Sequence, residues 1–230
     1  MFMNKKTLLL DVNNTFMFDE DKFGDNDNFS IHYKEIGGKF PADKVRSIIL
    51  SAYNYLNALY PDEKYKQNFP SVKTAILNTF GDTLSANEMK CILETFAFHE
   101  LGIIPKEYIN VLFKLKEHFI LSVVIDIWSD KKMWLETFNK TGLNALFSAS
   151  SFSSDHGMVK PSPKPFELVA NNLDLKPGEC LVIGDSIRRD LGGAIAAGID
   201  CILVGGATDN RAIHSYTSLL EFYNTLEAVD

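Results

Sequence analysis

The chain has 230 residues, a net charge of −7 and 46% hydrophobic residues, which suffices for one large domain or for a core with a smaller insertion. The negative charge argues against a nucleic acid or an anionic membrane as the partner. Its three cysteines show no metal-binding spacing and indicate reduced side chains in a cytoplasmic protein. The first apolar run is too short for a signal peptide, and no run approaches a membrane span.

The first predicted element is a buried strand over residues 7–10, which runs directly into Asp11. So short an apolar run suits a central strand of a parallel sheet. Ligands of open α/β sheets bind outside the carboxyl ends of the strands, so Asp11 is placed where chemistry takes place. The alternative is that Asp11 only caps the segment that follows it.

A helical block follows the first strand. Apolar residues at helical spacing predict helices over 41–60, 71–80 and 85–98, and the last begins with a capping box from Ser85 to Glu88. The block interrupts an otherwise alternating pattern of strands and helices. We therefore predict a core domain of residues 1–18 and 104–230 and an inserted helical domain of residues 19–103.

The alternating pattern resumes at residue 105. It predicts a helix to residue 118, a strand over 120–125, a helix ended by Gly142, a strand within 146–152 and a helix around Phe166. A strand before Asp185, a helix through Ala194 and a strand over 201–204 complete the series, and residues 154–156 are expected in a loop. The fold class is thus α/β, with a parallel sheet of about five strands.

The stretch 180–190 repeats the pattern of an apolar strand that runs into acidic residues, here Asp185 and, about one helical turn later, Asp190. If its strand neighbours the first one, Asp11 and Asp185 converge at one crevice. Carboxylates that face each other repel, and a divalent cation relieves that repulsion. An oxygen-lined site of this kind fits Mg²⁺.

Between these acids lies Lys160, followed by prolines that fix the backbone and start a helix, with Ser162 as a candidate N-cap. Lys160 could offer a fixed positive charge to an anionic substrate or to a nucleophile. On its own it would be interpreted as an ordinary surface lysine.

Taken together, these residues resemble the haloacid dehalogenase-like (HAD) hydrolase superfamily, subfamily I, with its Rossmann-like core. Asp11 matches the nucleophile, Lys160 the lysine of the third motif, and Asp185 with Asp190 the acidic fourth motif. The resemblance implies that the helical block is a C1-type cap that closes over the site. It also implies Mg²⁺ held by the Asp11 carboxylate, the backbone carbonyl of Asn13 and Asp185, with Asp190 in support.

Two positions depart from the family pattern. Family phosphatases carry a second aspartate as general acid and base, where this chain has Asn13, and an amide cannot shuttle that proton. The second motif usually has Ser or Thr at the end of its strand, where this chain has Ile125, followed by Asp126; both are assigned to substrate binding. Ser129 could replace the hydroxyl only if its loop curls back.

Three hypotheses compete on these grounds. The first is a Mg²⁺-dependent phosphatase for a small phosphorylated metabolite, in which Asp11, Asn13 and Lys160 are catalytic and activity is weak or limited to good leaving groups. The second is a binding or regulatory protein of the same fold without turnover. The third is a dehalogenase-like, carbon-centred hydrolase, against which the intact acidic motif argues.

Overall fold

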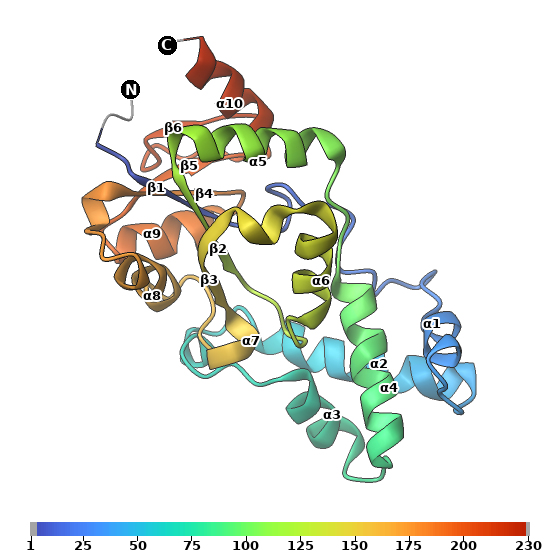
Figure 1. Cartoon of the computed structure of the whole chain (residues 1–230). Coiled ribbons are helices and arrows are strands. Elements are labelled where there is room, and N and C mark those ends of the chain that lie inside the picture. Colours follow the sequence, from blue (N-terminus) through green and yellow to red (C-terminus); the bar gives the residue numbers. More distant parts are fainter. Residues whose placement is uncertain (1–3, 229–230) are drawn as a thin grey trace.

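The computed structural model describes residues 4–228, and its centre is a parallel sheet of six strands (Figure 1). The strands lie in the order β3-β2-β1-β4-β5-β6. Their bounds are β1 Thr7–Leu10, β2 Ile120–Ile125, β3 Phe147–Phe152, β4 Cys180–Gly184, β5 Asp200–Leu203 and β6 His214–Ser215. β1 is therefore the central strand predicted from its uninterrupted apolar run.

The register of the sheet aligns the ends of the three middle strands. Leu10 of β1 pairs with Val123 of β2 on one side and with Ile183 of β4 on the other. Because all three strands run in the same direction, the residues after them emerge at one edge of the sheet. This edge carries the polar residues that follow each strand.

Helices cover both faces of the sheet. Leu8 and Leu10 face a hydrophobic cluster with α5, α6 and α10, whereas Leu9 faces α8 and α9. This alternation is the period of two expected of a strand that is buried on both sides. The bounds are α5 Lys106–His118, α6 Lys132–Thr141, α7 Ser153–His156, α8 Lys164–Asn172, α9 Gly192–Ala196 and α10 Leu219–Glu227, with short turns η2 Leu143–Ala145, η3 Pro177–Glu179 and η4 Ile187–Leu191.

The segment between β1 and α5 forms a helical block on one side of the sheet (Figure 1). Its elements are α1 Phe29–Glu35, α2 Ala42–Leu59, η1 Glu63–Tyr65, α3 Val72–Phe80 and α4 Ala86–Glu100. They pack around a second hydrophobic cluster that includes Phe29, Tyr33 and Phe96. The fold is therefore the predicted α/β core with an inserted helical cap, although the domain limits stay a prediction and their outer ends, residues 1–3 and 229–230, lie outside the described residues.

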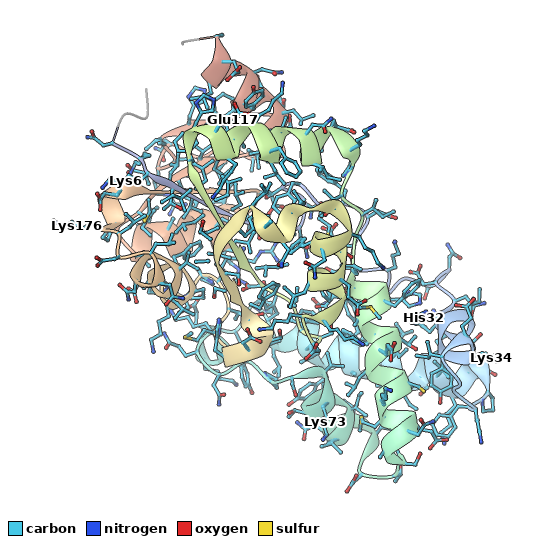
Figure 2. The ribbon with its side chains drawn as sticks, in the orientation of Figure 1. Lys6, His32, Lys34, Lys73, Glu117 and Lys176 are labelled. Atoms are coloured by element: carbon cyan, nitrogen blue, oxygen red, sulfur yellow. The ribbon has the colours of Figure 1, made fainter. Side chains whose placement is uncertain are left out.

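Charged side chains occupy the outside of the molecule, as Figure 2 shows for Lys34, Lys73, Glu117 and Lys176. Within residues 4–228, no helix combines the length and the apolar character that a membrane span requires. A group of buried ionisable side chains lies instead at the sheet edge described below.

Local sequence signals fix several helix ends. Ser85 and Glu88 form the predicted capping box of α4. Gly142 ends α6 in the left-handed conformation, with φ of 77°.

Two local expectations were wrong. Residues 154–156 belong to the short helix α7 rather than to a loop, and the N-cap of α8 is Pro163 rather than Ser162. The sheet also has a short strand of two residues, β6, in addition to the five expected.

Candidate active site

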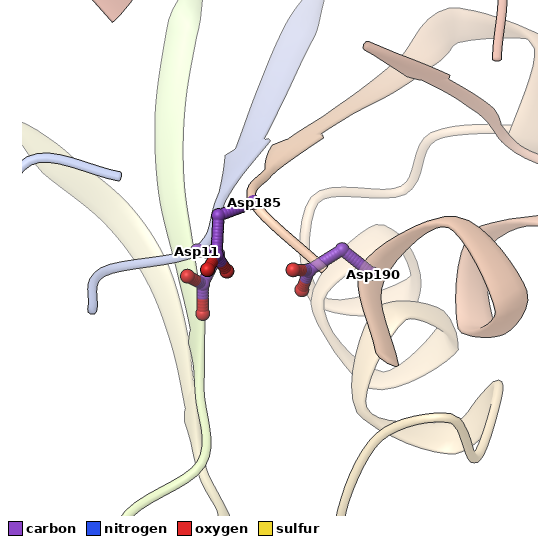
Figure 3. Close-up of side chains that lie close together, drawn as sticks. All are labelled: Asp11, Asp185 and Asp190. Atoms are coloured by element: carbon purple, nitrogen blue, oxygen red, sulfur yellow. The ribbon is translucent and has the colours of Figure 1, made fainter. Parts of the chain in front are cut away.

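Three carboxylates gather at the ends of β1 and β4. Asp11 follows β1, Asp185 follows β4, and Asp190 lies on η4, and Figure 3 shows their carboxylates turned toward one another. One oxygen of each lies within 4.8 Å of the others. The strand ends are joined directly, because the backbone N–H of Asp11 donates a hydrogen bond of 2.9 Å to the carbonyl of Ile183. The predicted convergence of the two strands thus brings these acids together.

The five-residue spacing from Asp185 to Asp190 depends on a π-turn. The carbonyl of Ser186 accepts hydrogen bonds from the backbone N–H groups of Asp190 at 2.9 Å and Leu191 at 3.1 Å. The wider turn accommodates one residue more than an α-turn and points Asp190 back at the strand end. Gly184 makes room for it, because a Cβ at residue 184 would lie 2.3 Å from the Asp190 carboxyl carbon.

Lys160 lies inside this cluster and is not a surface lysine. Only 2% of the residue is exposed, and its Nζ donates hydrogen bonds to Asp11 Oδ1 at 2.5 Å and Asp190 Oδ1 at 2.7 Å. Burial alone would lower the pKa of Lys160, but the negative charges of Asp11 and Asp190 hold it well above its usual value. Lys160 is therefore a fixed cation beside Asp11.

Burial dominates the ionisation of Asp11. It raises the pKa of Asp11 to about 7, although the charge of Lys160 opposes this effect; the charges of Asp190 and Asp185 add smaller increases. Burial also raises the pKa of Asp185, and the nearby charge of Asp190 adds to the effect. Such a site favours a ligand that brings positive charge.

Polar atoms after β1 and β4 have no partner among the described residues. Oδ1 of Asp185 and Oδ1 of Asn13 are buried and accept no hydrogen bond. Buried acceptors without partners are uncommon in folded proteins and indicate a missing ion, water or ligand. The unpartnered Asp185 oxygen is of the donor type that Mg²⁺ prefers, and Asp185 belongs to the three acids whose oxygens lie within 4.8 Å of one another, so these acids fit the predicted metal.

The end of β2 contributes Asp126 rather than Ile125. The Ile125 side chain is 1% exposed and lies in the hydrophobic cluster with α5 and α6, so any contact of this residue with a substrate is confined to its backbone. Asp126 Oδ2 accepts hydrogen bonds from the Lys160 backbone N–H at 2.9 Å and from the Tyr60 hydroxyl at 2.6 Å. Its Oδ1 is buried and has no partner among the described residues.

Ser129 does not replace the missing hydroxyl of the second motif. Its Oγ donates to Oε2 of Glu100, at the end of α4, and its backbone N–H donates to the same oxygen at 3.0 Å. The backbone N–H of Trp128 donates to the other Glu100 oxygen at 2.6 Å. The loop after β2 is therefore held by the helical block, and the Ser129 hydroxyl is already used.

Two site residues escaped the sequence reasoning, Tyr60 and Arg189. Tyr60 follows α2 and is expected only as the end of a helix, yet its hydroxyl reaches Asp126 of the core. Arg189 lies between the two acids of the fourth motif, and its Nη1 donates a hydrogen bond of 3.4 Å to the Tyr60 hydroxyl. In the sequence, the one feature that could have pointed to Arg189 is the pair of arginines between Asp185 and Asp190.

Comparisons with known proteins show which proteins this chain resembles. The family model for haloacid dehalogenase-like hydrolases matches residues 108–198, a range that contains Lys160, Asp185 and Asp190. A glyceraldehyde 3-phosphate phosphatase of Pyrococcus furiosus is 26% identical over 157 residues, which cover 66% of this chain and 63% of that protein. These matches support the resemblance of the chain to the HAD-like hydrolase superfamily.

Solved structures of HAD proteins share the fold over nearly the whole chain. A HAD phosphatase from Thermococcus onnurineus aligns with a TM-score of 0.63 and 23% identity, covering 96% of this chain and 97% of that one. A 2-haloacid dehalogenase from Pseudomonas syringae aligns with a TM-score of 0.64 and 18% identity, covering 98% and 100%. Because both reactions occur on this HAD fold, the choice between them depends on the site.

Proposed function

We propose that this HAD-like protein hydrolyses a phosphate ester of a small metabolite through Asp11. The observation that carries the proposal is the double contact of the Lys160 ammonium with Asp11 and Asp190. A buried cation beside the nucleophile neutralises charge as an anionic group approaches. A phosphoryl group is such an anion, and the related Pyrococcus protein is named a phosphatase.

Catalysis on this proposal has two steps. A carboxylate oxygen of Asp11 attacks phosphorus, and the bond from phosphorus to the leaving oxygen breaks, which forms an aspartyl-phosphate. Water then attacks the phosphorus of this intermediate, releases inorganic phosphate and restores the Asp11 carboxylate. Thr15 orients the nucleophile, because its hydroxyl donates a hydrogen bond of 3.1 Å to Asp11 Oδ2.

The acidic cluster is proposed to hold Mg²⁺. Asp11, Asp185 and the backbone carbonyl of Asn13 would be its protein ligands, with Asp190 in support. Asp190 suits the supporting role, because its oxygens already accept hydrogen bonds from Lys160 and from the Ser186 backbone N–H. When bound, the cation would stabilise negative charge on the transferring phosphoryl group.

Asn13 limits the substrates of this reaction. General acid catalysis typically contributes about 10²- to 10⁴-fold, and an amide cannot supply it. The loss of rate is largest for a poor leaving group such as an alkoxide. The phenolate of an aryl phosphate and the carboxylate of an acyl phosphate leave without protonation. We therefore propose that the natural substrate has a good leaving group, or that turnover is slow.

Residues 19–103 are proposed to act as the cap that selects this substrate. Asp11 is 6% exposed and Lys160 2% exposed, and Tyr60 of the helical block contacts Asp126 beside them. A substrate reaches Asp11 only when these contacts open, so the block would control access.

Asn13 also favours a second candidate, a HAD-like binding protein without turnover. It would keep the crevice and Lys160 and bind the same phosphorylated ligand. A dehalogenase-like reaction is the third candidate. It is compatible with Asn13, but it does not account for the acidic cluster, because an attack on carbon does not require a cation at Asp185 and Asp190.

The deciding experiment is hydrolysis of an aryl phosphate by the purified protein, with Mg²⁺ and with EDTA, alongside Asp11→Asn. Activity that requires both the metal and Asp11 would support phosphoryl transfer. Silence under all conditions, combined with binding of inorganic phosphate that Lys160→Met abolishes, would favour the binding protein. Release of halide from a 2-haloacid without metal would favour the dehalogenase.

A further inference from the structure

Arg189 brings a second positive charge to the crevice. It lies on η4, one residue before Asp190, and is half-buried. Its Nη1 is 3.4 Å from the Tyr60 hydroxyl, and its guanidinium carbon is 5.6 Å from the centre of the Tyr60 ring. The guanidinium is therefore held against the helical block rather than extended into solvent.

A short series of contacts connects Arg189 to Asp11. The Tyr60 hydroxyl that accepts from Arg189 donates to Asp126 at 2.6 Å, and Asp126 accepts from the Lys160 backbone at 2.9 Å. The Lys160 ammonium in turn contacts Asp11. Arg189 thus lies beside Tyr60, whereas the Lys160 ammonium contacts Asp11 itself.

Arg189 differs from the other arginines in having no carboxylate partner. Arg46, Arg188 and Arg211 each have a carboxylate oxygen within 4.0 Å. Within the part of the chain that the structure describes, no carboxylate oxygen approaches Arg189 this closely. A guanidinium has five N–H donors, and the single long bond to Tyr60 leaves most of them available for a ligand.

We propose that Arg189 binds a carboxylate of the substrate, at the end away from the phosphoryl group. The inference rests on the proposed function and narrows its substrate class to phosphate esters that carry a carboxylate. The planar fork of a guanidinium matches the two oxygens of a carboxylate. A carboxylate also fits better than a second phosphate, because its single charge is repelled less by the acids around Asp11.

The neighbouring Arg188 provides a matched control. It also contacts the helical block, because its guanidinium donates to the carbonyls of Tyr60 at 3.3 Å and Pro61 at 3.4 Å. Unlike Arg189, it is exposed and has Glu63 within 3.9 Å. Loss of Arg188 therefore tests the attachment of the block without removing the proposed carboxylate contact.

The test is calorimetric binding of phosphonates, which need no turnover. Phosphonoacetate, 3-phosphonopropionate and 4-phosphonobutyrate are each compared with their neutral amides, with and without Mg²⁺, in wild-type protein, Arg189→Gln and Arg188→Gln. We expect at least one acid to bind about 10- to 100-fold more tightly than its amide, which is the usual range for a charge-assisted contact. Arg189→Gln should abolish this preference, and Arg188→Gln should keep it.

Several outcomes would overturn the inference. The wild type could bind every acid and its amide equally. The preference for the acid could also survive in Arg189→Gln, or it could be lost equally in Arg188→Gln and Arg189→Gln. If Arg189→Gln fails to fold, Arg189→Lys replaces it, and a preference as large as that of the wild type would contradict a two-oxygen contact. An inactive protein that prefers the acids would refute the proposed function alone, and an active one without the preference would refute this inference alone.

Discussion

The hydroxyl of Tyr60 donates a hydrogen bond of 2.6 Å to Asp126, and this contact joins the helical block to the core beside Lys160. Tyr60 follows α2, whereas Asp126 directly follows β2. Burial and the negative charge of Asp126 together raise the pKa of Tyr60 well above its usual value, so the phenol keeps its proton and remains the donor. The position of the block is thus coupled to the backbone of Lys160.

Tyr60→Phe should lower the free energy of unfolding by about 1 to 3 kcal/mol, because it leaves a buried carboxylate with one donor fewer. It should also lower KM, because on the proposed function a substrate reaches Asp11 only when this contact opens. Urea denaturation and steady-state kinetics measure the two effects. Tyr55→Phe is the control, since the Tyr55 hydroxyl accepts only an exposed hydrogen bond from Asn78; equal losses in both variants would contradict the coupling.

Asn13→Asp should restore the missing proton donor. We expect at least a tenfold rise in kcat/KM for alkyl phosphates and a much smaller change for aryl phosphates, because only the alkoxide needs protonation. Parallel kinetics on one substrate of each class measure the difference. An equal gain on both substrates would point to altered binding, and no gain would mean that other parts of the site have also departed from phosphoryl transfer.

Lys160→Met should destabilise the protein strongly in the absence of divalent cations. It leaves Asp11 and Asp190 buried without their shared cation, and breaking such a pair typically costs about 3 to 5 kcal/mol. Addition of Asp11→Asn should recover part of the loss, because one unpaired charge is removed. Chemical denaturation in EDTA is the measurement, and the exposed Lys73→Met is the control; a change no larger than that of Lys73→Met would refute the buried position of Lys160.

The sequence predicted those parts of the site that depend on local pattern. Each of Asp11 and Asp185 follows an apolar strand. Their convergence could be predicted because neighbouring parallel strands end at one edge of the sheet. A role for Lys160 as a fixed positive charge was predicted only in combination with these acids, and its burial was not predicted. Strand β6 was missed because a strand of two residues carries no hydrophobic period.

Contacts between the helical block and the core could not be predicted. Whether Tyr60 reaches Asp126, or Glu100 reaches Ser129, depends on how the inserted helices are oriented on the sheet. That orientation results from packing between surfaces far apart in sequence, which leaves no periodic signal. The Ser129 hydroxyl was for this reason considered a substrate contact, although it is bound to Glu100.

Glu100 should make stability depend on pH. The side chain is 4% exposed at the end of α4, and burial, with the charge of Asp21, raises its pKa from 4.5 to about 7 despite three hydrogen bonds from Trp128 and Ser129. Between these two pH values the unfolded chain has lost a proton that the folded protein still holds. The free energy of unfolding therefore falls as the pH rises through this interval.

The expected loss from Glu100 between pH 4.5 and pH 8 is about 3 kcal/mol, at 1.36 kcal/mol for each pKa unit. Glu100→Gln removes this titration, and its amide oxygen still accepts a backbone hydrogen bond, so the variant should lose less stability over the same interval. Urea unfolding at several pH values, with Glu94→Gln of the same helix as control, measures the difference in slope. Parallel curves for wild type and Glu100→Gln would show that Glu100 ionises equally in both states, because any fixed cost of the substitution shifts the curve without changing its slope.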